Sequence, residues 1–186
     1  MKPNWYMNID LTGAQEKEAG IPASVLRGKL LSFLHPVFKT HPNTFALAIT
    51  NEHKRLRVFA SSLEELVMLG QRLNPQPWIR DYTRFDAPIQ VPDDFSGTWT
   101  SFTRYRIPTE KTDRKQGDER GQLRQRRLQT ATEERMDYFM LRSKSTSQFF
   151  TLIIQRKNGE APATNCFPNS YGFSVNDRPF SLPDLP

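Results

Sequence analysis

The architecture is set by residues 45–73, which read FALAIT-NEHK-RLRVFA-SSLEELVMLGQRL. Phe45–Thr50 and Leu56–Ala60 are short runs rich in apolar and β-branched or aromatic residues, and the polar residues 51–54 separate them. Two such runs joined by a short polar loop are typical of a β-hairpin. The centre of this stretch therefore predicts two antiparallel strands.

A helix is expected immediately after the hairpin. A serine followed three residues later by a glutamate occurs twice, as Ser61 with Glu64 and as Ser62 with Glu65. Either pair has the spacing of a capping box, which satisfies the free N–H groups at the start of a helix. The helix is expected to run to about Leu73, since a proline follows at position 75.

The flanking segments extend this unit to a ferredoxin-like order. Trp5–Leu11 is predicted as a strand, and Ala23–Phe38 has apolar residues at helical spacing. Trp78–Phe85 is predicted as a further strand after the second helix. The resulting order, β-α-β-β-α-β, is that of the ferredoxin-like motif. We predict that it forms an N-terminal domain over residues 1–97.

Residues 98–186 are predicted to form a C-terminal domain. Pro88, Pro92 and Gly97 mark the boundary before it. Its expected elements are the strands Trp99–Ile107, Tyr138–Arg142 and Phe149–Gln155, an arginine-rich helix over Asp113–Thr130 and a short strand near Tyr171. The predicted fold class is therefore α+β: a ferredoxin-like N-terminal domain plus a C-terminal domain with a small sheet and an arginine-rich helix.

Composition limits the functional classes. With 37% hydrophobic and 11% aromatic residues, the chain is too apolar to be wholly disordered. No apolar run approaches the roughly 20 residues that span a bilayer, so no membrane partner is expected. The N-terminus lacks the apolar stretch of a secretion signal, which makes the cytoplasm the expected compartment. Cys166 is the single cysteine, so an internal disulfide is excluded.

Positive charge is concentrated in the second half. Residues 98–186 carry 15 basic and 10 acidic side chains, whereas residues 1–97 carry 11 and 10. Arg120, Arg124 and Arg127 fall at i, i+4 and i+7, on one face of the predicted helix, and Arg126 lies to one side. Guanidinium groups in such a row can follow the phosphates of a nucleic acid. A solvated charged helix is the alternative.

A second polar segment precedes the last predicted strand. Residues 141–150 read LRSKSTSQFF, in which hydroxyl and amide side chains lie beside two cations and lead into two phenylalanines. Hydroxyls and backbone amides can hold a phosphate, and an exposed phenylalanine can stack on a base. The alternative is a polar hairpin loop whose phenylalanines are buried.

Phosphate-loop and dinucleotide-binding motifs are absent from the sequence, as is the signature of RNA-recognition motifs. The three histidines, His35, His41 and His53, have neither metal-ligand spacing nor a cluster of carboxylates around them. We therefore expect neither a metal site nor a cofactor.

Several motifs together resemble one family. They are the Leu-Arg-Ser-x-Ser-Thr-x-Gln-x-Phe pattern at 141–150, Ser-Tyr-Gly-x-Ser at 170–174, Ser-Val-Leu-x-Gly-Lys-Leu at 24–30 and the opening strand with Tyr6, Ile9 and Asp10. The chain resembles the CRISPR repeat-RNA endoribonucleases of type I-F systems, the Csy-type members of the Cas6 superfamily. The resemblance covers nearly the whole chain.

The resemblance implies a function in antiviral defence. Such proteins bind the hairpin of the CRISPR repeat RNA with the arginine-rich helix in its major groove. They cleave precursor CRISPR RNA at the 3′ base of the stem without a metal. The ribose 2′-OH attacks the neighbouring phosphate, leaving a cyclic or 3′ phosphate. The protein then stays on the guide RNA as a subunit of the type I-F surveillance (Cascade) complex, and a monomer is expected on each RNA.

The resemblance also assigns residues. Ser143 corresponds to the serine that constrains the ribose, and Tyr171 to the tyrosine that orients the catalytic histidine. The remaining residues implied in RNA binding are Arg104, Arg106, Lys144, Ser145, Thr146 and Phe150, beside the helix arginines Arg120, Arg124, Arg126 and Arg127. Position 106 is glutamine in the family pattern, so Arg106 implies an altered base preference, and a bidentate arginine favours guanine.

The catalytic histidine departs from the family pattern. There it directly follows Gly-Lys-Leu, and that position here is Leu31, which cannot accept a proton. His35 lies one helical turn further on the same face, and an insertion of one turn upstream would restore the alignment. We predict His35 as the catalytic histidine. His41 and a non-cleaving protein that only caps the guide-RNA hairpin remain alternatives, as does an unrelated basic RNA-binding protein of ferredoxin-like fold.

Overall fold

The computed structural model describes residues 1–12, 21–52, 54–108, 121–143 and 146–186. Its helices and strands, in chain order, are β1 (Trp5–Leu11), α1 (Ala23–Thr40), β2 (Ala46–Ile49), β3 (Arg55–Ala60), α2 (Leu63–Leu73), α3 (Pro77–Tyr82), β4 (Thr83–Phe85), β5 (Ile89–Gln90), β6 (Trp99–Tyr105), α5 (Gly121–Glu133), β7 (Asp137–Arg142), β8 (Phe149–Gly159) and β9 (Leu182–Pro183). The α+β prediction is confirmed. No helix of the described part is long and apolar enough to cross a membrane.

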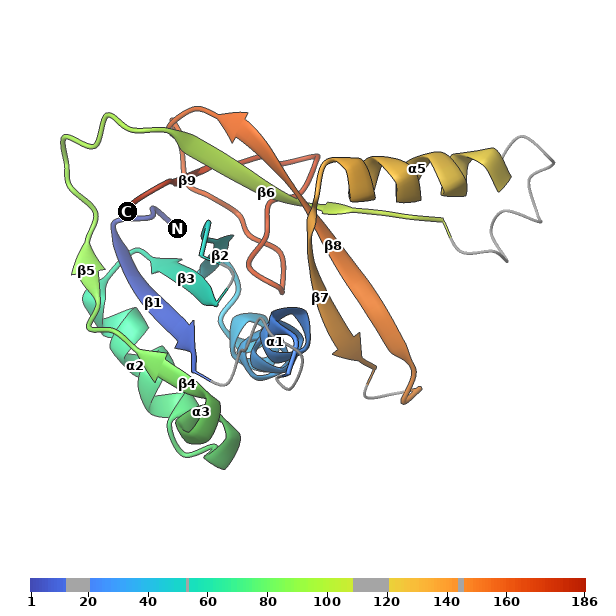
Figure 1. Cartoon of the computed structure of the whole chain (residues 1–186). Helices are drawn as coiled ribbons and strands as arrows, with labels where there is room; N and C mark the ends of the chain where they lie inside the picture. Colours follow the sequence, from blue (N-terminus) through green and yellow to red (C-terminus); the bar gives the residue numbers. More distant parts are fainter. Residues whose placement is uncertain (13–20, 53, 109–120, 144–145) are drawn as a thin grey trace.

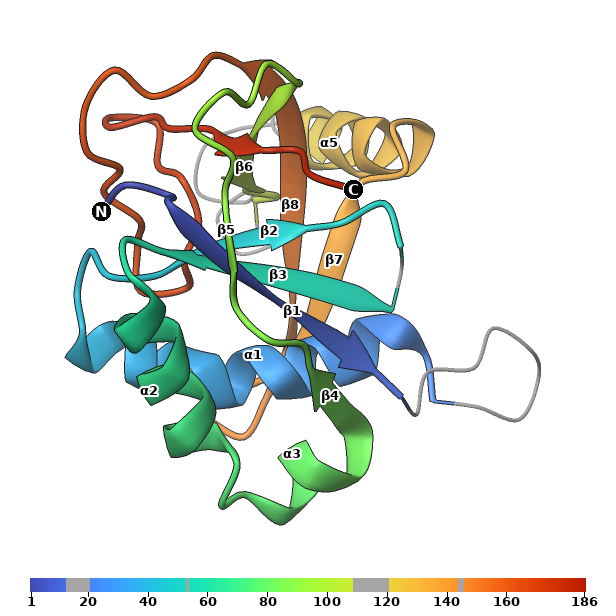
Figure 2. The same ribbon diagram turned by 90° about the vertical axis from the view of Figure 1, so that its left-hand side faces the viewer.

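The first sheet has the strand order β2-β3-β1-β4, and β5 pairs with the other end of β1 (Figure 1). All of these pairs are antiparallel. The helices α1 and α2 both contact β1 and also contact each other, as Figure 2 shows. Two helices over an antiparallel sheet whose first strand lies between the third and fourth form the predicted ferredoxin-like unit.

The start of α2 distinguishes between the two predicted capping boxes. The hydroxyl of Ser62 accepts from the backbone N–H of Glu65, and the Glu65 carboxylate accepts from the backbone N–H groups of Ser61 and Ser62. This reciprocal arrangement satisfies N–H groups that the helix itself cannot bond. The second of the two predicted pairs is therefore the one that forms.

Two predicted strands are wrong. Residues 78–82 belong to helix α3, and only Thr83–Phe85 forms a strand. Pro77 occupies the start of that helix, and the ring of Trp78 stacks on Phe33 at 5.6 Å and on Tyr82 at 5.3 Å. The segment at Tyr171 is a turn, stabilised by the Asn169 side chain, and Ser174 alone forms a bridge to β6.

The second sheet has the order β7-β8-β6-β9, and α1 lies between it and the first sheet (Figure 1). Gly28 permits the close approach of α1 to β7, because a Cβ at this position would lie 1.8 Å from the carbonyl oxygen of Met140. Of the predicted arginine-rich helix, residues 121–133 form α5, whereas residues 113–120 lie outside the described residues. Both sheets contribute to one buried apolar core.

Candidate functional site

His35 lies in the last turns of α1, and its imidazole contacts the turn at residues 169–172. Its Nδ1 lies 2.7 Å from the backbone carbonyl oxygen of Ser170. Since a carbonyl oxygen can only accept, Nδ1 carries the hydrogen in this contact, and the Nε2 atom of the neutral ring is left without one. The imidazole is half-buried and is thus fixed in one tautomer.

Tyr171 covers the same imidazole from one side. The ring centroids of Tyr171 and His35 are 4.2 Å apart, and the ring planes are inclined by 12°. The turn that presents Tyr171 requires Gly172, whose φ is +84° and whose position leaves no space for a Cβ beside Phe38 and Leu47. The structure thus brings together two of the three predicted catalytic residues.

The third, Ser143, follows β7 in the hairpin between β7 and β8. Its hydroxyl accepts from the backbone N–H of Thr146 at 3.2 Å, and its backbone N–H donates to the carbonyl of Gln148 at 2.8 Å. Ser147 has a φ of +56°, which closes this tight loop. Lys144 and Ser145, both predicted to bind RNA, lie outside the described residues.

Packing of α1 on β7 relates this hairpin to the histidine. The two elements cross where Gly28 meets Met140. Seven residues of α-helix separate Gly28 from His35, a path of about 10 Å. Three residues of strand separate Met140 from Ser143, again about 10 Å. His35 and Ser143 therefore lie on neighbouring elements, each a short distance from one crossing point.

Phe149 and Phe150 point to opposite faces of β8, because successive side chains of a strand alternate. Phe150 pairs with Leu141 and shares the face that packs toward α1, with 38% of its surface exposed. Phe149 is 74% exposed and lies beneath the guanidinium of Arg142 at 5.8 Å. The alternative of a polar hairpin loop with buried phenylalanines is wrong, since both side chains are accessible.

The helix arginines make contacts within the chain that the sequence did not predict. Arg124 donates to the carbonyl of Pro108 at 2.8 Å, and Arg127 donates to the carbonyl of Arg106. The guanidinium of Arg127 also lies 5.7 Å from the centre of the Tyr105 ring. These contacts hold α5 against the segment that follows β6. Arg126 is exposed, whereas Arg120 lies outside the described residues.

Arg104 and Arg106 lie beside that helix contact. Both are exposed, one in β6 and one directly after it. Together with Arg127 they line a cavity of about 420 Å³. The structure therefore groups three of the predicted RNA-binding arginines around one hollow.

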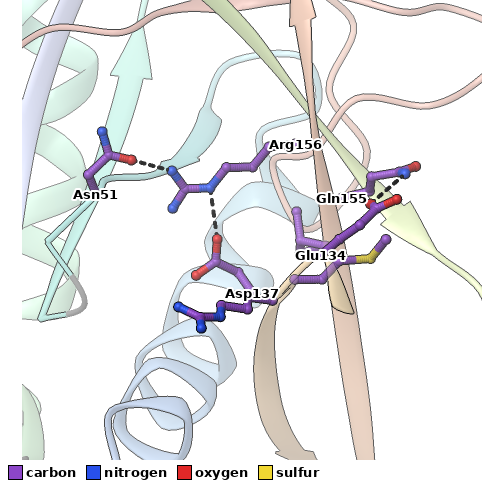
Figure 3. Close-up of a pocket in the computed structure, with 8 residues that line it drawn as sticks. Asn51, Glu134, Asp137, Gln155 and Arg156 are labelled. Carbon is purple, nitrogen blue, oxygen red and sulfur yellow. Dashed lines mark hydrogen bonds and ion pairs between the residues drawn. The ribbon is translucent and has the colours of Figure 1, made fainter. Parts of the chain in front are cut away.

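An ion-pair cluster that the sequence analysis missed joins the two sheets (Figure 3). Asp137 accepts from Arg27 at 3.0 Å and from Arg156 at 2.8 Å. Arg156 also donates to the side chain of Asn51 and to the carbonyl of Thr50, both in the loop after β2. Arg27 could have been found as a lone cation on the apolar face of the predicted helix, but nothing in the sequence identifies its partner.

The described residues offer little for metal binding or for cysteine chemistry. Within the described ranges, no group of three or more His, Cys, Asp and Glu side chains is placed to hold a metal ion. Burial raises the pKa of the Cys166 thiol to about 11, so this cysteine is protonated at neutral pH and is a poor nucleophile. His41 caps the end of α1 through the carbonyl of Val37.

Comparison with protein families identifies the family of this chain. A family model described as CRISPR-associated protein (Cas_Csy4) matches residues 6–183. The chain belongs to the Csy4 family of CRISPR-associated proteins. Csy4-family proteins bind and process CRISPR repeat RNA, and an unrelated basic RNA-binding protein of ferredoxin-like fold is no longer a candidate. A search of curated proteins found no match to this Csy4-family chain.

Proposed function

We propose that this protein cleaves precursor CRISPR RNA at the 3′ base of the repeat hairpin, without a metal ion. In this reaction the ribose 2′-OH attacks the adjacent phosphorus, the bond from phosphorus to the 5′-oxygen breaks, and the products end in a 2′,3′-cyclic phosphate and a 5′-hydroxyl. The attacking hydroxyl must lose a proton, and the departing oxygen must gain one.

The arrangement of His35 with Ser170 and Tyr171 supports this proposal most directly. The hydrogen bond from Nδ1 leaves Nε2 free to accept the proton of the 2′-OH. Stacking on Tyr171 restricts rotation of the imidazole, so the base is held before the substrate arrives. Ser143, on the hairpin after β7, is proposed to position the ribose.

The remaining predicted residues are proposed to bind the hairpin. Phe150 is accessible on the face toward α1 and is proposed to stack on the base pair that closes the stem. Arg104, Arg106 and the α5 arginines are proposed to contact bases and phosphates of the major groove, with Arg106 favouring guanine. After cleavage the protein is proposed to remain on the guide RNA, as a single copy, in the type I-F surveillance complex.

Leu31 supports a second candidate function. It occupies the position at which the family pattern places histidine, and it is fully buried in the core. If no other residue replaces that histidine, the protein only binds the hairpin and caps the guide RNA. His35 argues against this candidate, because it lies one turn further along α1 and carries the contacts described above.

A cleavage assay on the repeat hairpin in a chelating buffer tests the proposal. The hairpin from the repeat of the neighbouring CRISPR array is incubated with the protein in EDTA, and the ends of the products are identified. We expect one cut at the 3′ base of the stem, and no cut when the scissile nucleotide carries a 2′-deoxyribose. Cleavage of the deoxy substrate would exclude attack by the 2′-OH. Tight binding with no cleavage of either RNA would favour the capping function.

A further inference from the structure

A groove on the second sheet begins at the arginines proposed to contact the hairpin and continues beyond them. Phe102, Leu152, Ile154 and Arg156 form the sheet face directed toward α1, so their neighbours point to the opposite face. Along β6, two adjoining cavities of about 420 and 570 Å³ share Thr103, Lys157 and Asn176 in their linings, and Thr103 and Lys157 belong to the face that points away from α1. The shared residues make them one continuous groove.

The end of the groove nearest α5 is cationic. Its lining contains Arg104, Arg106, Arg127 and Lys157, and none of the described residues that line this end is acidic. The side chains of Gln155 and Asn176 add amide groups that can both donate and accept. Four cations around one hollow raise the local concentration of polyanions. A phosphate-bearing chain fits this end.

The other end is polar but nearly uncharged. Lys157 stands at the junction, and beyond it the lining offers hydroxyl and amide side chains with one carboxylate, Glu160. The exposed Asn158, Thr164 and Asn165 supply those hydroxyls and amides, whereas Ser101 and Ser181 are buried beneath them. From Arg106 to Ser101 the groove follows β6 for about 17 Å. Uncharged donors and acceptors along such a path suit riboses and unpaired base edges.

The segment that runs alongside β6 at the groove is held by hydrogen bonds. Ser174 bridges to Thr103, and its backbone N–H donates to the carbonyl of Phe102 at 2.9 Å. Its hydroxyl accepts from the backbone N–H of Phe180 at 3.0 Å. Ser174 is buried, so the exposed side chain of Asn176, two residues later, is held beside β6.

We infer that this groove binds the unpaired RNA that adjoins the repeat hairpin, with Lys157 as its central phosphate contact. The inference rests on the proposed hairpin binding and extends it from the paired stem to a single strand. Cavities of this size accept separate nucleotides rather than a double helix, and the cationic end begins at the arginines proposed to contact the stem. An acidic protein segment is the competing occupant, but the uncharged far end offers it no cations.

Tailed hairpins provide the test. The dissociation constant is measured for a bare hairpin and for hairpins with ten unpaired uridines on the 5′ or the 3′ side, each with a 2′-deoxyribose at the scissile nucleotide. The measured quantity is the gain in affinity that a tail provides. We expect one tail to give a gain of about tenfold in wild type, as for one charge-assisted contact. Lys157→Ala should abolish most of that gain and reduce the salt slope of the tailed RNA by about 0.7.

Lys2→Ala is the matched control, since Lys2 is exposed and lies outside the groove. Lys2→Ala should show the same tail-dependent gain in affinity as wild type. The inference is overturned if neither tail increases affinity, if Lys157→Ala retains the gain, or if Lys2→Ala loses it equally. If wild type binds a poly-glutamate peptide, Lys157→Ala loses that binding, and no RNA tail increases affinity, the groove would be assigned to a protein partner instead. Failure of wild type to bind even the bare hairpin would instead refute the proposed function.

Discussion

The Ser170 carbonyl determines which nitrogen of His35 can accept a proton. Nδ1 donates to it at 2.7 Å, so Nε2 is the available base. A positioned imidazole nitrogen with a free lone pair can act as a general base. At the scale of single residues, the turn at 169–172 is therefore part of the proposed chemistry, because it supplies both the carbonyl and the stacked ring of Tyr171.

Tyr171 should act through its ring rather than its hydroxyl. Tyr171→Ala removes a stacked pair of the kind that contributes about 0.5–1.5 kcal/mol, which should slow single-turnover cleavage by about two- to tenfold. Tyr171→Phe retains the ring and should cleave at close to the wild-type rate. An equal loss of cleavage rate in Tyr171→Ala and Tyr171→Phe would show that the hydroxyl, not the stacking, is required.

Cys166 should be chemically silent in the folded protein. It is 1% exposed, and burial raises its pKa to about 11, so at pH 8 only about one thiol in a thousand is ionised. We expect no labelling by iodoacetamide under native conditions and complete labelling in urea. Rapid modification of the native protein would contradict the placement of this segment against the N-terminus, where its backbone N–H bonds the carbonyl of Met1.

At the scale of elements, α1 links the proposed catalytic parts. It carries His35, it contacts both β1 and β7, and its Gly28 lies against the backbone of Met140. Any displacement of α1 from β7 would change the distance between the histidine and the Ser143 hairpin. The close packing at Gly28 is therefore a requirement for the geometry of the site.

Two glycine substitutions test this contact. Gly28→Ala would place a Cβ 1.8 Å from the Met140 oxygen, and it should lower the free energy of unfolding by about 1–3 kcal/mol and slow cleavage. Gly70→Ala, in α2, has no atom within 4 Å of the added Cβ and should stabilise the protein by up to about 1 kcal/mol. Urea titration of both variants measures the difference. Equal effects would show that α1 and β7 are not closely packed.

The sequence predicted those elements whose signals are local. The capping box of α2, the apolar residues at every second position of β1, and the aromatic and β-branched residues of β7 and β8 identify these elements from neighbouring residues alone. Residues 78–82 were assigned wrongly, because Trp78, Ile79 and Tyr82 suit a strand or a helix. Packing of Trp78 against Phe33, far away in the sequence, accompanies the helix. The β9 strand is two residues long and leaves no pattern.

In the candidate site, too, only features with a local sequence signal were predictable. His35 and Tyr171 were identified from motifs, but the partner of Nδ1 is a backbone carbonyl, which no residue type reveals. The contacts of Arg124 and Arg127 with carbonyls after β6 were also unpredictable, since an arginine-rich helix has the same sequence whether it faces solvent or the chain. These features depend on tertiary placement.

At the scale of the whole molecule, an ion-pair cluster centred on Asp137 and Arg156 connects the second sheet to α1 and to the loop after β2. Asp137 is 12% exposed and lies between Arg27 of α1 and Arg156 of β8, and Arg156 also bonds the loop after β2. Removing this carboxylate would leave the buried guanidinium of Arg27 without its counter-charge. Loss of one partner from a buried pair is strongly destabilising.

Asp137→Asn should therefore lower the free energy of unfolding by about 3–5 kcal/mol. The control is Asp177→Asn, which makes the same chemical change in an exposed pair with Arg178 and should change stability by less than about 1 kcal/mol. Urea unfolding of both variants at pH 7 gives the comparison. If both substitutions change the free energy of unfolding by a similarly small amount, the ion pairs of Asp137 do not stabilise the packing of the two sheets.

The identity of the base is tested most directly by single-turnover cleavage of the repeat hairpin in EDTA. Wild type is compared with His35→Ala and with His41→Ala, which removes the histidine that caps α1. His35→Ala should lower the rate by at least about 10²-fold, with hairpin affinity nearly constant, because positioned proton transfer contributes that much. His41→Ala should cleave at a rate close to that of wild type. Normal cleavage by His35→Ala, with loss of cleavage in His41→Ala, would contradict the assignment of His35.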